Sequence, residues 1–179
     1  MVRIVYRRRI ERAGFTIVEL LIVIVVIAIL AAISMVAYNG IQTRAKNTAQ
    51  ATAVAESIKL LKAYKALNGE YPTEGGCLGN NNIDTNGDGK NDCGDNGRTV
   101  VNQILFDKLD TVGTQPTVVT DQIVGVSGVK RAGVFWERGT SRLIWFVKGN
   151  SIDDCGLQSS LALFGARDGS SIWCGTTLD

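Results

Sequence analysis

The chain contains no histidine, and this absence excludes several kinds of catalytic and metal site. Serine and cysteine nucleophiles usually depend on a histidine base, so no Ser-His or Cys-His system is possible. A zinc site is disfavoured too, because the spacing of the four cysteines does not suit one. The GxxxxGK[ST] loop that binds nucleotide phosphates is also missing, so energy for mechanical work must come from a separate protein. We therefore predict that the protein is not an enzyme, with a membrane-tethered enzyme as the alternative from that class.

A basic stripe of the kind that binds nucleic acid is also lacking. The lysines and arginines of the C-terminal third are scattered at strand spacing and balanced by acids, which is typical of a solvated face. These residues are Lys130, Arg131, Arg138, Arg142, Lys148 and Arg167. We therefore expect no nucleic-acid partner.

Positive charge is instead concentrated at the N-terminus. Residues 1–14 hold five arginines and one glutamate, a net charge of +4, so the rest of the chain carries −2 of the total of +2. The apolar stretch from Phe15 to Ala37 follows, long enough to span a bilayer at about 1.5 Å per residue. Because basic flanks stay in the cytoplasm, we expect a single-pass protein of the cytoplasmic membrane with its N-terminus inside.

Glu19 is a lone carboxylate at the edge of this apolar stretch. An ionised carboxylate in hydrocarbon costs about 2.5–3.5 kcal/mol on insertion scales, so its presence predicts a partner. The alternative interpretation is a secretory signal peptide with a small-residue cleavage site at Ala28–Ala32. That alternative leaves Gly14-Phe15 and Glu19 without a purpose.

The order of basic leader, Gly14-Phe15, Glu19 and apolar run resembles the processing signature of type IV prepilins and pseudopilins. The resemblance implies that a membrane peptidase cuts between Gly14 and Phe15 and methylates the new amino terminus at Phe15. It also implies a cleaved leader at 1–14, a membrane or filament-core helix at 15–38, and an exported globular pilin domain at 39–179.

By the same resemblance the protein is a structural subunit of a type IV pilus, used for adhesion, twitching or surface contact. Cleavage would give Phe15 a cationic amine, and methylation keeps that charge. Glu19 would pair with the Phe15 amine of a neighbouring subunit, which sets the register because a misplaced subunit leaves both charges unpaired. Head-to-tail docking with a rotation that does not close yields an open helical homopolymer.

The expected partners are further copies of the chain, a prepilin peptidase, a pilus assembly platform with a separate ATPase, and the cytoplasmic membrane before assembly. The assembled filament would be extracellular. One alternative is a minor pilin or pseudopilin of a type II secretion or DNA-uptake system. Another is a tethered calcium-binding receptor module that does not polymerise.

The predicted fold class is α+β, with a long N-terminal helix packed on a small antiparallel β-sheet as in pilins. Nothing from Phe15 to about Leu67 forbids a single helix, and Asn68-Gly69 supplies a stop signal. Beyond the apolar run the helix becomes amphipathic. Its predicted inner face holds Ala51, Val54, Ile58 and Leu61, and its predicted outer face holds Lys46, Gln50, Lys59 and Lys62. The family usually has a glycine and a proline at the positions of Ala28 and Val36, so we expect less helix melting in a filament, or melting displaced towards Ser34–Gly40.

The remainder of the chain reads as short elements. The stretch Gly75–Gly97 is too polar to make a core, and Thr99–Leu109 predicts a short helix. Strands are predicted at Gly133–Glu137 and Leu143–Val147 as a hairpin, with two more at Leu161–Gly165 and Ser171–Cys174. We expect the three tryptophans to pack where sheet meets helix, with ligand stacking as the alternative: Trp136, Trp145 and Trp173.

Four cysteines lie in the part of the chain that we expect to be exported, where an even number suggests disulfides with three possible connectivities. The simplest choice joins sequence neighbours, Cys77 with Cys93 and Cys155 with Cys174. Each bond would close a short loop, worth about 3 kcal/mol in the chain-entropy model.

Residues 84–95 space oxygen-bearing side chains as a calcium loop does, with Gly89 at the turn. A shorter acid stands at the twelfth position, where a glutamate usually binds with both oxygens. The candidate ligands are Asp84, Asn86, Asp88, Lys90 (through its carbonyl), Asp92 and Asp95. We predict calcium as the cofactor in preference to magnesium, because a flexible all-protein oxygen cage suits the larger ion. The alternative is a solvated turn cluster without metal.

Overall fold

The computed structural model describes residues 14–80, 92–95, 99–119, 123–157 and 163–178, and the chain divides into two compact units, Met1–Ile41 and Gln42–Asp179. The candidate calcium ligands at positions 84–90 lie outside the described residues. The described part of the first unit consists of the start of helix α1 and the residues just before it. The second unit holds the rest of α1 and the β-strands of the described residues.

Helix α1 runs from Ile17 to Asn68, which confirms the predicted single helix. It is unbroken through Ser34–Gly40; what happens to that segment in a filament stays a prediction. The helix ends where Gly69 takes a φ of 85° and its N–H bonds to the Lys65 carbonyl at 2.8 Å, a left-handed stop that glycine adopts without strain.

Within the second unit, α1 buries the face that the periodicity predicted. Val54 and Leu61 are fully buried and Ile58 nearly so. The assignment of Gln50 to the outer face was wrong, since its side chain is 1% exposed. The burial of Gln50 is explained by two hydrogen bonds, which join it to the backbone of Gly133 and Val119.

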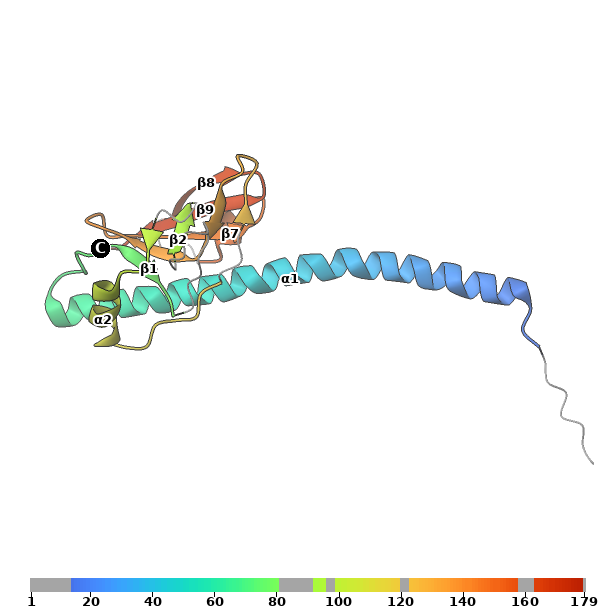
Figure 1. The fold of residues 1–179 in the computed structure, drawn as a ribbon, viewed down its shortest axis with the longest axis horizontal. Coiled ribbons are helices and arrows are strands. Elements are labelled where there is room, and N and C mark those ends of the chain that lie inside the picture. Colours follow the sequence, from blue (N-terminus) through green and yellow to red (C-terminus); the bar gives the residue numbers. More distant parts are fainter. Residues whose placement is uncertain (1–13, 81–91, 96–98, 120–122, 158–162, 179) are drawn as a thin grey trace, which may run out of the picture. The chain divides into compact units, whose positions relative to one another are not determined.

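The second unit is built around a five-stranded antiparallel sheet in the order β1-β6-β7-β9-β8 (Figure 1). Its strands are β1 Gly76–Leu78, β6 Val134–Glu137, β7 Arg142–Lys148, β9 Ser171–Thr177 and β8 Leu163–Asp168. Strands β6 and β7 form the predicted hairpin, and β8 and β9 form a second one around Gly169, whose φ is 63°. The predicted α+β class, a long helix packed on a small antiparallel sheet, is therefore confirmed.

The main core forms between α1 and one face of this sheet. Alternate residues of β6 are buried there, Val134 and Trp136, because successive strand residues point to opposite faces. Trp136 and Trp145 are 1% and 0% exposed, so both are packing residues as expected. Each indole N–H bonds to a carbonyl, that of Pro72 for Trp136 and that of Cys155 for Trp145. Trp173, in β9, is only half-buried.

A second sheet of four short strands, in the order β3-β2-β5-β4, was not predicted. It consists of β3 Thr99–Val100, β2 Asp92–Asp95, β5 Lys130–Ala132 and β4 Ile123–Val124. Strand β2 contacts β6 and β7 of the larger sheet. The expectation that Gly75–Gly97 contributes no core was wrong at its ends, because Cys77, Leu78 and Cys93 are all buried. The Cys77–Cys93 disulfide and strands β1 and β2 hold these residues in the interior, although the residues around them are polar.

Two shorter helices complete the second unit. Helix α2, Gln103–Asp110, is capped by the Asn102 side chain, and it begins later than predicted because Thr99–Val100 is a strand. The 3₁₀-helix η1, Ile152–Cys155, carries a capping box between Ser151 and Asp154 and ends at Gly156 in a left-handed conformation.

Candidate assembly site at the start of the apolar helix

The residues at the predicted cleavage position precede α1 and have no regular structure. Gly14 is exposed, and the Phe15 side chain is 86% exposed. The first hydrogen bond of α1 runs from the Leu20 N–H to the Thr16 carbonyl at 3.3 Å, which makes Thr16 the residue at which the helix is capped. The Gly14-Phe15 bond therefore lies in irregular, exposed chain just outside the helix.

Thr16 and Glu19 satisfy each other across the first turn of α1. The Glu19 N–H donates to Thr16 Oγ1 at 3.2 Å, while Glu19 Oε2 accepts from the Thr16 N–H and from Thr16 Oγ1, both at 2.8 Å. This is a capping box, which occupies backbone N–H groups that a helix start otherwise leaves unpaired. A carboxylate also lies favourably at this positive end of the helix dipole. The pair thus holds the Glu19 carboxylate at the first turn, beside residues 14–16.

Both described hydrogen bonds that the Glu19 carboxylate accepts end on one oxygen, Oε2. Within the described part of the chain, Oε1 accepts none. A carboxylate has about four acceptor positions, so Oε1 can accept from a further donor without loss of the cap.

The sequence analysis predicted a role for Glu19 but did not predict that Thr16 caps the helix. The signal was present: a threonine followed three residues later by a glutamate and an apolar run is a helix-start pattern. The structure adds that Glu19 has a partner within its own chain even before any neighbour is present.

The first unit presents an apolar surface that nothing in the described structure covers. Large apolar side chains of α1 from Ile17 to Ile41 are between 48% and 81% exposed. By length and composition α1 can cross a membrane, a criterion that a signal sequence near the N-terminus also meets. Burial of such a surface, in lipid or against other helices, is favourable by about 25 cal/mol per Å² of apolar area.

The structure places the remaining predicted site residues in the second unit. Cys77 is bonded to Cys93 and Cys155 to Cys174, with Cα–Cα distances of 5.7 and 6.0 Å. These are the pairs that join sequence neighbours. Of the calcium candidates, Asp84, Asn86, Asp88 and Lys90 lie outside the described residues. The backbone at Asp92 and Asp95 forms the ends of β2, paired with β3 and β5 respectively.

Comparison with known families supports the interpretation of the N-terminus. Residues 11–35 match the model of the prokaryotic N-terminal methylation motif. No curated protein and no solved structure matches the chain. The match covers the predicted cleavage position, Glu19 and most of the apolar run, so the chain carries a type IV pilin-like processing signature followed by a membrane-anchoring helix.

Proposed function

We propose that this type IV pilin-like protein is the structural subunit of a type IV pilus filament. Cleavage between Gly14 and Phe15 would convert a membrane-anchored precursor into a subunit with a cationic, methylated amine at Phe15. The apolar helices would then leave the lipid and bundle, and the filament would be extracellular. Adhesion, twitching motility or surface contact are the activities such a fibre serves.

The observation that carries this proposal is the arrangement of Glu19 at the first turn of α1. Its Oε2 is bonded to Thr16, and its Oε1 accepts no hydrogen bond from the described residues. In the proposed filament, Oε1 accepts from the Phe15 amine of a neighbouring subunit. A buried pair of this kind adds little net stability, but a subunit docked at the wrong height leaves two charges uncompensated, which costs about 3–5 kcal/mol. The pair therefore selects one register.

The test is Glu19→Ala in cells that express the assembly machinery. Processing should be normal, with mass spectrometry finding a methylated Phe15, whereas the yield of sheared fibres should fall sharply. The matched control is Glu56→Ala, which removes an exposed carboxylate from the same helix within the second unit. Normal fibre yield from Glu19→Ala would overturn the pairing. A mature protein that still begins at Met1 would overturn the assignment as a whole.

The second candidate function is a minor pilin or pseudopilin of a type II secretion or DNA-uptake system. The same methylation motif favours it equally, since both classes are processed in the same way. Abundance separates the two: a major pilin dominates sheared surface fibres, whereas a minor subunit is scarce in them. In either role we propose a prepilin peptidase, an assembly platform and a separate ATPase as partners, and no enzymatic activity of the chain itself.

We also propose that residues 84–95 bind calcium through the six candidate ligands named above. The Cys77–Cys93 disulfide and the pairing of β2 fix the backbone of the last residues of this segment, which lowers the entropy lost when oxygen ligands gather on an ion. Calcium should then raise the melting temperature by mass action. Chelation should lower it, and magnesium at equal concentration should restore less. An unchanged transition on chelation, with Asp88→Ala equal to the parent, would remove the calcium site.

A further inference from the structure

A surface groove with a volume of about 550 Å³ lies in the second unit, at the C-terminal end of α1. Three segments line it: the last turn of α1 around Lys65, the turn that follows it at 69–73, and the end of β6 at Trp136 with the connection to β7 up to Ser141. Ligand sites commonly have volumes of about 300–1,000 Å³ and combine apolar surface with a few polar groups. All the lining residues belong to the described part of the chain.

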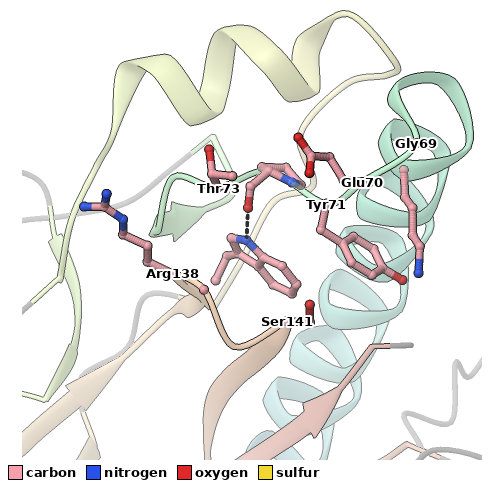
Figure 2. Close-up of a pocket in the computed structure, with 10 residues that line it drawn as sticks. Gly69, Glu70, Tyr71, Thr73, Arg138 and Ser141 are labelled. Atoms are coloured by element: carbon pink, nitrogen blue, oxygen red, sulfur yellow. Dashed lines mark hydrogen bonds between the residues drawn. The ribbon is translucent and has the colours of Figure 1, made fainter.

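The floor of the groove is aromatic and held in place. The rings of Tyr71 and Trp136 lie 5.5 Å apart between centroids at an angle of 53°. The Trp136 indole N–H donates to the Pro72 carbonyl at 3.0 Å, which ties β6 to the turn (Figure 2). An aromatic floor fixed in this way loses little conformational entropy when a ligand docks.

The groove carries a cation towards each end. Lys65 Nζ lies 4.5 Å from the centroid of the Tyr71 ring, while Arg138 is exposed and lies on the other side of the Trp136–Pro72 hydrogen bond from Tyr71 (Figure 2). The neighbouring acid, Glu137, forms an ion pair with Arg142 at 3.2 Å. With Glu70 the lining has a net charge of +1.

Neutral and acidic oxygen groups complete the lining. The Glu70 carboxylate is an acceptor, and the Ser141 hydroxyl can donate and accept. The Ser141 backbone is fixed, since its carbonyl accepts from the Leu178 N–H at 2.7 Å. Groups of this kind suit a ligand that has hydroxyl groups of its own.

We infer that this groove binds an acidic oligosaccharide, a chain of sugars bearing carboxylates. Its carboxylates would bond to Arg138 and Lys65, its hydroxyls would bond to Glu70 and Ser141, and the edge of one ring would lie against the half-buried side chain of Tyr71. We expect more than one sugar, because Lys65 lies on α1 whereas Arg138 lies on the connection after β6. The inference goes beyond the filament role and does not depend on polymerisation.

Single-stranded nucleic acid fits the same groove less well. Sequence-tolerant binding of single strands needs aromatic faces free for base stacking along a positive groove. Here one face of Tyr71 is covered by Lys65, its ring contacts Trp136, and Trp136 itself is 1% exposed.

The test is titration of the purified full chain in detergent micelles with digalacturonate, followed by isothermal calorimetry and saturation-transfer NMR. Neutral galactobiose of the same linkage and oligothymidylate are the comparison probes. We expect digalacturonate to bind more tightly than either, with an affinity that falls as salt rises. Arg138→Gln and Lys65→Gln should each weaken binding about tenfold, the value of one charge-assisted hydrogen bond.

The matched control is Arg44→Gln, an exposed arginine on α1 that does not line the groove; its affinity should equal that of the parent. Unchanged melting temperatures verify that the variants fold. Absence of digalacturonate binding, equal binding of galactobiose, tighter binding of oligothymidylate, or full affinity in Arg138→Gln would each overturn the inference. Fibre assembly is scored separately, so failure here leaves the proposed filament role untouched.

Discussion

The side chain of Gln50 donates from Nε2 to the carbonyl oxygen of Gly133 at 2.8 Å, and so joins the middle of α1 to the start of the β6 region. Its Oε1 accepts from the Val119 N–H, also at 2.8 Å. One buried side chain therefore satisfies two backbone groups from segments far apart in the sequence. It fixes the height at which the helix packs on the sheet.

Gln50→Ala should therefore destabilise the second unit. The substitution removes the Gln50 partner of the buried Gly133 carbonyl and of the half-buried Val119 N–H, which costs about 1–3 kcal/mol. Thermal melting followed by near-ultraviolet circular dichroism would measure the loss. The matched control is Gln42→Ala, an exposed residue of the same helix, which should change the free energy of unfolding by less than about 0.5 kcal/mol. Equal melting of the two variants would contradict the bridging role.

The same residue marks the limit of what the sequence could predict. Apolar spacing correctly placed Val54, Ile58 and Leu61 on the buried face, because burial of apolar area dominates that choice. The burial of a glutamine cannot be predicted from apolar spacing. Gln50 is buried because the tertiary structure places the Gly133 carbonyl and the Val119 N–H within its reach. Strand β2 escaped prediction for a similar reason, since its place depends on pairing with distant β5 and on the Cys93 disulfide.

More of the candidate site could be predicted from the sequence, because its signals are local. Gly14-Phe15, Glu19 and the apolar run are consecutive, and the matched motif covers them. The Thr16–Glu19 cap is also local and could have been predicted. The groove at Tyr71 and Trp136 could not be predicted, since it joins residues separated by nearly half of the second unit.

Loss of the Cys155–Cys174 disulfide should destabilise the second unit strongly. Both cysteines are fully buried, and 19 residues separate them in the sequence. Release of a loop of this size costs about 3 kcal/mol in the chain-entropy model. The double variant Cys155→Ser/Cys174→Ser should therefore melt well below the parent under oxidising conditions. A parent that melts at the same temperature with and without reductant would contradict this expectation.

Stability should also depend on pH through Asp168. Hydrogen bonds from Ser127 and from Arg131, whose Nη1 lies 2.8 Å from Asp168 Oδ2, lower the pKa of Asp168 from 3.8 to about 2. A lowered pKa means that folding favours the ionised form, so this contribution is fully present above pH 3.8 and is lost as the pH falls towards 2. The contact joins the loop after β4 to the β8–β9 turn.

Asp168→Asn should make the melting temperature depend less on pH between 3.8 and about 2. The variant should be less stable than the parent at neutral pH, and the difference between them should shrink between pH 3.8 and about 2. Asp110→Asn, at an exposed position of α2, serves as the control. If the parent and Asp168→Asn lose stability in parallel over this range, the assigned pKa is wrong.

Thr16 offers a final test that separates the cap from the carboxylate itself. Thr16→Ala removes the hydroxyl that bonds to Glu19 in both directions, but keeps the Thr16 N–H and the predicted cleavage bond. Loss of a cap of this type costs about 1 kcal/mol, so Glu19 should be held less firmly and fibre yield should fall, though less than in Glu19→Ala. Thr16→Ser keeps the hydroxyl and should assemble as the parent does. Quantitative immunoblots of sheared fibres, normalised to processed subunit, would measure all three. Were Thr16→Ser to fail as severely as Thr16→Ala, the methyl group rather than the hydrogen bonds would be what assembly requires, because only the methyl distinguishes serine from threonine.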